Sequence, residues 1–125
     1  MLFRSCMTAP DTPKSHHMMN AERFAQMKDG SIFISVSRGG LVDTDALMDA
    51  LESGRFFGVG LDVIEGEPLR SDHPIWARED VLITPHIGGM SPRRGERLIE
   101  LFTENLRRYQ AGEPLRNLVD LQAGF

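Results

Sequence analysis

Short apolar runs alternate with amphipathic stretches along the 125 residues of the chain. The runs are rich in β-branched and aromatic residues and are bounded by turn residues, so they predict strands. We expect four strands, at 2–8, 31–36, 56–63 and 81–84. The run SIFISV at 31–36 is typical of a parallel strand that is buried on both faces.

Two amphipathic stretches between the strands predict helices. Asn20 is a good N-cap for a helix over about 21–28. Asp43 or Thr44 caps a second helix that runs to about Ser53. The residues expected to face inward on these two helices are Phe24, Met27, Leu47, Ala50 and Leu51.

A third, longer helix is expected after the last strand. Ser91 is its predicted N-cap, with Pro92 at the first helical position, and Gly112 ends it. Its apolar stripe consists of Leu98, Ile99, Phe102, Leu106 and Tyr109. The remaining tail shows no regular pattern.

The alternation of strands and helices favours an α/β fold with a parallel sheet. Ligands of such sheets bind at the carboxyl ends of the strands. The segments at those ends are Ala9-Pro10, Ser37-Arg38, 62–67 and His86.

Composition and charge exclude several classes. The chain has 14 Lys+Arg against 18 Asp+Glu, a formal net charge of -4, which disfavours nucleic acid or an anionic membrane as a partner. No apolar run is long enough to span a bilayer. The single cysteine, Cys6, cannot form an internal disulfide and is expected to pack inside an apolar strand. We therefore expect a cytoplasmic protein.

Three of the strand ends carry residues that suit reduction of a 2-keto acid. Arg38 offers a planar fork of donors that matches a substrate carboxylate. His86 can give or take a proton near neutral pH, and one of the acids at 62–67 can hold its ring. Taken alone, however, each residue is more typical of a solvated turn, a surface acid or a structural histidine.

Metal binding is not predicted. His16 and His17 are adjacent, so in a regular element their side chains point apart, and a solvated loop is the expected state of both. His73 and His86 have no second ligand at helical spacing.

The segments that carry these residues resemble one protein family. The signature region of the D-isomer-specific 2-hydroxyacid dehydrogenases is similar to VSRGGLVDTDALMDALESGRFFGVGLDVIEGEPL, HPIW and VLITPHIGG in this chain. The upstream MMNAERFAQMKDGSIFISVSRGG resembles the same family. The HPIW segment and the ending QAGEPLRNLVDLQAGF most resemble its glyoxylate/hydroxypyruvate reductase A branch.

The resemblance implies a role for each site residue. Arg38 would bind the substrate carboxylate, His86 would be the general acid and base, and Glu67 would pair with His86. The cofactor, NAD or NADP, would lie against Ala9, Val36, Ser37, Arg38, Asp62, His86 and Gly88, with Asp62 at the nicotinamide carboxamide. The substrate would be a small 2-keto or 2-hydroxy acid of the glyoxylate or hydroxypyruvate type, and the enzyme a homodimer.

The resemblance also implies parts that this sequence does not contain. The family's cofactor domain opens with a G-x-G-x-x-G turn that holds the pyrophosphate, and this sequence has no such motif. We therefore expect residues 1–90 to be the second half of a Rossmann-type NAD(P)-binding domain. Residues 91–125 would be a helix and tail that pack on a separate substrate domain. Two hypotheses remain: part of a dehydrogenase that is active when complete, or an inactive remnant that self-associates through a strand edge and its last helix.

Overall fold

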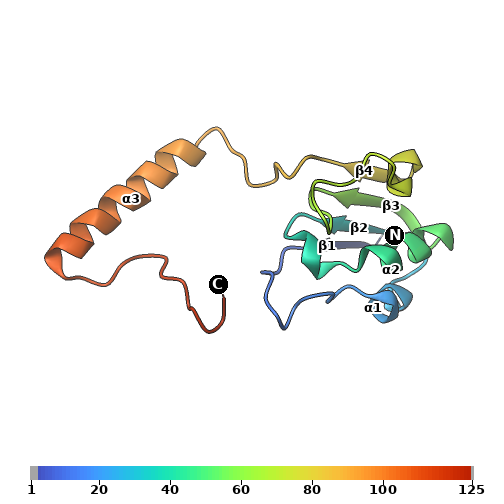
Figure 1. The fold of residues 1–125 in the computed structure, drawn as a ribbon, viewed down its shortest axis with the longest axis horizontal. Coiled ribbons are helices and arrows are strands. Elements are labelled where there is room, and N and C mark those ends of the chain that lie inside the picture. Colours follow the sequence, from blue (N-terminus) through green and yellow to red (C-terminus); the bar gives the residue numbers. More distant parts are fainter. Residues whose placement is uncertain (1–2, 125) are drawn as a thin grey trace. The chain divides into compact units, whose positions relative to one another are not determined.

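The chain forms two compact units, which divide between Gly88 and Gly89. The computed structural model describes residues 3–124. The first unit contains a parallel sheet of four strands in the order β1-β2-β3-β4, which are Arg4–Met7, Ser31–Ser35, Phe56–Leu61 and Val81–Ile83 (Figure 1). The predicted α/β class and all four strands are confirmed. Leu2, where the first strand was expected to begin, lies outside the described residues.

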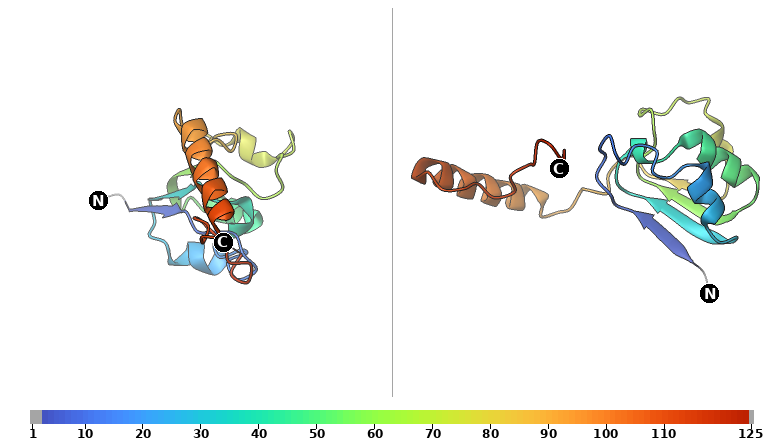
Figure 2. Two further views of the ribbon diagram at one scale, coloured as in Figure 1. Left: turned by 90° about the vertical axis from the view of Figure 1, so that its left-hand side faces the viewer. Right: turned by 90° about the horizontal axis from the view of Figure 1, so that it is seen from below.

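Two helices pack on one face of the sheet, α1 (Ala21–Gln26) and α2 (Thr44–Glu52) (Figure 2). Their N-caps are the predicted ones. The Asn20 side chain accepts a hydrogen bond from the Arg23 N–H at 3.1 Å, and that of Asp43 accepts one from the Ala46 N–H at 3.0 Å. Such bonds satisfy amide groups that have no partner within the first turn.

The core lies between these helices and the sheet. Phe24 of α1 packs edge-on against Phe33 of β2 and Phe56 of β3, with ring centroids 5.4 and 5.7 Å apart. All five residues predicted to face inward belong to this core or pack against it. The periodicity of the sequence therefore identified the buried side of both helices.

The opposite face of the sheet is less covered than predicted. Ile32 and Ile34 of β2 are half-buried, and Leu82 of β4 is 70% exposed. The expectation that 31–36 is buried on both faces is therefore wrong for the described chain, because both helices of the first unit pack on the other side.

Cys6 also departs from its prediction. It is exposed, although we expected it to be packed inside a strand. The reason is its position on β1, which is an edge strand of the described sheet, pairs there with β2 alone and is mostly exposed.

The second unit consists of α3 (Arg94–Ala111) and an irregular tail. The helix ends at Gly112, which has a left-handed φ of 71°, as predicted. Its start is not at Ser91-Pro92. The Ser91 carbonyl closes a turn by accepting the Arg94 N–H at 3.0 Å, so the N-cap position falls on Arg93, which makes no side-chain cap. None of its described residues is buried, and no described helix is long and apolar enough to cross a membrane.

Candidate active site

The turn after β4 is organised by one carboxylate. Asp62, directly after β3, accepts hydrogen bonds from the Thr84 hydroxyl, from the Ile87 N–H at 2.9 Å and from the Gly88 N–H at 2.6 Å. The Thr84 bond lowers the pKa of Asp62 despite partial burial, and the two backbone bonds lower it further. Asp62 therefore holds both sides of His86, which sits between these partners with a left-handed φ of 54°.

His86 and Glu67 form the central pair of the site. The Nδ1 atom of His86 lies 2.7 Å from Oε2 of Glu67, and the other carboxylate oxygen accepts the Ile64 N–H at 2.8 Å. Burial tends to raise the pKa of Glu67, but the bonds from His86 and Ile64 outweigh it and leave the pKa lowered. A carboxylate that is held in this way fixes the orientation of the His86 ring.

Arg38 lies at the end of β2 but makes no hydrogen bond to this pair within residues 3–124. Its guanidinium donates to the Ser37 carbonyl at 2.7 Å, and its side chain is exposed. The turn that follows is tight, since a Cβ on Gly39 would lie 2.2 Å from the Ile64 carbonyl oxygen. The arginine is therefore carried on a segment that is anchored against the loop after β3.

The residues proposed for the cofactor lie along the same carboxyl edge. The Val36 N–H donates to the carbonyl of Met7, two residues before Ala9, at 3.2 Å, and a Cβ on Gly88 would lie 3.9 Å from the Val36 Cβ. Ser37 is buried, and its hydroxyl has no hydrogen-bond partner among residues 3–124. A half-exposed apolar side chain beside an unpaired hydroxyl and a glycine fits a flat ring with a polar substituent, so the residues present suit a nicotinamide.

A cavity of about 520 Å³ opens beside the His86–Glu67 pair. Its polar lining comes from Asp62, Glu67, Thr84 and His86, and its apolar lining includes Ile64, Leu69, Trp76 and Ile83. Sequence reasoning missed Thr84 and Trp76. The position of Thr84 directly after a strand could have identified it. Trp76 lies in a short 3-10 helix, Pro74–Ala77, which no periodic pattern in the sequence predicts.

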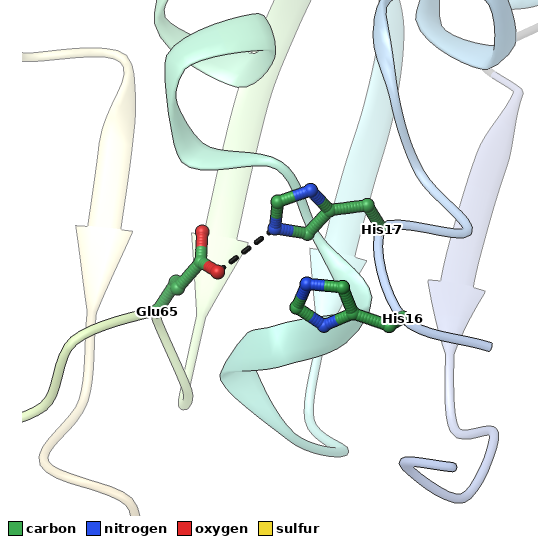
Figure 3. A group of neighbouring side chains, drawn as sticks. All are labelled: His16, His17 and Glu65. Carbon is green, nitrogen blue, oxygen red and sulfur yellow. Dashed lines mark hydrogen bonds and ion pairs between the residues drawn. The ribbon is translucent and has the colours of Figure 1, made fainter. Parts of the chain in front are cut away.

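Glu65 does not join the pair but bonds to the first loop. Its Oε1 lies 2.8 Å from Nε2 of His17, and this bond raises the pKa of His17. The rings of His16 and His17 are stacked 4.0 Å apart on the same side of the chain (Figure 3). The two histidines lie in a loop, as expected, and His17 has a left-handed φ of 49°. Their side chains therefore do not point apart as they would in a regular element.

Comparison with known proteins agrees with this arrangement. Residues 5–88 match the D-isomer specific 2-hydroxyacid dehydrogenase, NAD binding domain. Glyoxylate/hydroxypyruvate reductase B of Cronobacter sakazakii is 38% identical over 94% of this chain and 36% of that protein. The chain thus spans little more than a third of the length of this relative.

Two solved structures are similar throughout most of the chain. A D-isomer specific 2-hydroxyacid dehydrogenase from Xanthobacter autotrophicus Py2, in complex with NADPH and MES, is 42% identical with a TM-score of 0.91, over 98% of this chain and 50% of that one. An NADPH-dependent glyoxylate/hydroxypyruvate reductase from Sinorhizobium meliloti, in complex with NADP and sulfate, is 31% identical with a TM-score of 0.89. The match covers 98% of this chain and 40% of that one.

Proposed function

The chain belongs to the D-isomer specific 2-hydroxyacid dehydrogenases, and we propose that it carries the acid–base residues for NAD(P)-dependent reduction of a small 2-keto acid. The observation that supports this most directly is the His86–Glu67 pair at 2.7 Å, on a turn that Asp62 holds at the carboxyl edge of the sheet. That edge is where α/β sheets bind ligands.

The residues have distinct roles in this proposal. Arg38 binds the substrate carboxylate through its fork of N–H donors, of which one nitrogen donates to the Ser37 carbonyl and the others make no hydrogen bond within residues 3–124. His86 donates a proton to the carbonyl oxygen as the carbonyl carbon receives hydride, and it takes that proton back in the reverse direction. Glu67 keeps the ring oriented through its contact with Nδ1.

The cofactor is NAD or NADP, and it supplies the hydride when bound. We propose that Ala9, Val36, Ser37, Arg38, Asp62, His86 and Gly88 border it. The unpaired Ser37 hydroxyl supports a polar contact there. Both carboxylate oxygens of Asp62 already accept hydrogen bonds from the turn that carries His86. In this proposal Asp62 therefore has two roles, because it holds that turn and also contacts the nicotinamide carboxamide.

We propose glyoxylate or hydroxypyruvate as substrate, as for an enzyme of the reductase A or B type. The names of the relatives from Cronobacter and Sinorhizobium support this class. In the complete enzyme, residues 1–90 would be the second half of the NAD(P)-binding domain, and 91–125 would pack on the substrate domain of a homodimer. The exposed apolar stripe of α3 supports that packing.

The test is a chimera in which this chain replaces the matching part of the Xanthobacter dehydrogenase. We expect the chimera to oxidise NADH or NADPH with glyoxylate or hydroxypyruvate. His86→Gln should lower kcat by about 100-fold or more, since general acid catalysis contributes that much. Glu79→Gln, on an exposed carboxylate outside the site, is the control. Turnover that survives His86→Gln would contradict the assignment.

The exposed apolar residues of α3 favour an alternative to an active enzyme. The α3 residues Leu98, Ile99, Phe102 and Tyr109 are each more than half exposed, which suits an inactive remnant that self-associates. The chimera experiment also distinguishes the two proposals. A folded chimera that shows no turnover, together with a 125-residue chain that forms a defined oligomer, would favour the remnant.

A further inference from the structure

We propose that His16, His17 and Glu65 bind a divalent transition-metal ion of the Zn²⁺ class. Each residue offers one ligand atom, and these atoms lie within 4.8 Å of one another (Figure 3). The cluster is separate from the proposed acid–base pair, because Glu65 bonds to His17 whereas Glu67 bonds to His86.

The chemistry of the three donors suits zinc. Imidazole nitrogens and a carboxylate oxygen are common zinc ligands, with bonds of about 2.0–2.2 Å and ligand atoms about 3.3 Å apart in a tetrahedron. The His17–Glu65 separation of 2.8 Å is slightly shorter than this, so small rotations of the side chains accommodate an ion. In the metal-bound form the ion replaces the proton that His17 and Glu65 share, and water completes the coordination.

The loop that presents the histidines is already fixed. The Ser15 hydroxyl is buried and donates to the Pro10 carbonyl at 2.7 Å, and the Thr12 N–H donates back to it at 2.8 Å. The His17 N–H donates to the Gly40 carbonyl at 2.8 Å. These bonds hold the left-handed turn that places the two rings side by side, so the backbone is ordered before binding. The rings then rotate out of the stack, so that a nitrogen lone pair of each points at the ion.

Acidic groups around the cluster favour a cation. The Nδ1 atom of His17 lies 4.0 Å from Oδ2 of Asp43, on the ring edge that does not face Glu65. At this distance the carboxylate makes no hydrogen bond to the ring, but its negative charge favours a cation at the cluster. Asp11 and His16 both border Gly40, since a Cβ there would lie 2.9 Å from the aspartate oxygen and 3.3 Å from Nδ1 of the histidine.

The test is calorimetric titration of the 125-residue chain with Zn²⁺, in a Cys6→Ser background that removes the only thiol. We expect one equivalent to bind. His16→Gln and Glu65→Gln should each weaken binding by more than about tenfold. His73→Gln and Glu79→Gln, which alter a histidine and a glutamate outside the cluster, should leave it unchanged.

Because His16 is exposed, the His16→Gln variant should fold normally. It therefore tests the proposal even if the Glu65→Gln variant fails to fold. A second readout is thermal unfolding, which Zn²⁺ should shift upward in the parent chain and by less in His16→Gln at the same zinc concentration. Absence of binding, or binding that His16→Gln leaves unchanged, would overturn the proposal.

Discussion

A single carboxylate fixes the turn that presents His86. The Asp62 carboxylate accepts hydrogen bonds from Thr84, before the histidine, and from Ile87 and Gly88, after it. All three donors therefore point at the same side chain. The sequence could predict that Asp62 follows a strand. It could not predict this set of partners, because they lie more than 20 residues further along the chain.

Replacing Asp62 should change the acid stability of the fold. The pKa of Asp62 is lowered in the folded state, so its contribution is fully present above the ordinary aspartate pKa of about 3.9 and is lost as pH falls through the lower folded value. Asp62→Asn should therefore be less stable at neutral pH and show a shallower decline below about pH 4. Urea unfolding followed across pH 2–7, roughly the range of that titration, measures both effects. An unchanged acid-side slope would contradict this role.

Gly39 is required by the closeness of two backbones. A Cβ there would lie 2.2 Å from the Ile64 carbonyl oxygen and 2.7 Å from the Glu65 amide nitrogen, which are main-chain atoms that cannot rotate away. Gly39→Ala should lower the free energy of unfolding by several kcal/mol, on the order of 3, as overpacking does. Gly89→Ala, with no neighbour within 4 Å, is the matched control and should change it little. Equal unfolding midpoints for both variants would refute the steric argument.

The helices show which local signals determine an element. Asn20 and Asp43 were predictable as caps because each precedes an amphipathic stretch whose buried face then meets the sheet. Ser91 had the same local signal, yet α3 begins three residues later, at Arg94. No described residue of α3 is buried, so no packing fixes its first turn, and the local turn at 91–94 determines the start.

The cap of α2 should contribute measurably to stability. The Asp43 carboxylate accepts the Ala46 N–H at 3.0 Å, and its removal leaves that amide without a partner in the helix. Asp43→Ala should lower the free energy of unfolding by about 1 kcal/mol, while Asp43→Ser, which retains a capping oxygen, should lower it by less. Chemical denaturation of the three proteins compares them directly. A serine variant as unstable as the alanine variant would show that capping is not the cause.

Across the whole chain, the buried apolar residues of the described structure all belong to the first unit. The Phe24, Phe33 and Phe56 cluster and the residues packed on it account for the core. The alternation of apolar runs predicted this arrangement well, since each helix of the first unit buries its stripe. The same periodicity predicted the apolar face of α3 but not what packs against that face. Periodicity indicates which side of a helix is apolar and gives no information about the element that covers it.

This distribution predicts that residues 1–90 fold without α3 and the tail. The truncated chain keeps the whole core and the Asp62 bonds to Ile87 and Gly88, so its free energy of unfolding should match that of the full chain within about 0.5 kcal/mol. Phe24→Leu, a change in the core, should lower the free energy of unfolding equally in both. Removal of the exposed Leu98, Phe102 and Tyr109 should also reduce concentration-dependent association, measured by sedimentation. A truncated chain that is unfolded would instead mean that the second unit contributes contacts essential to the first, and the division of the chain into independent units would be wrong.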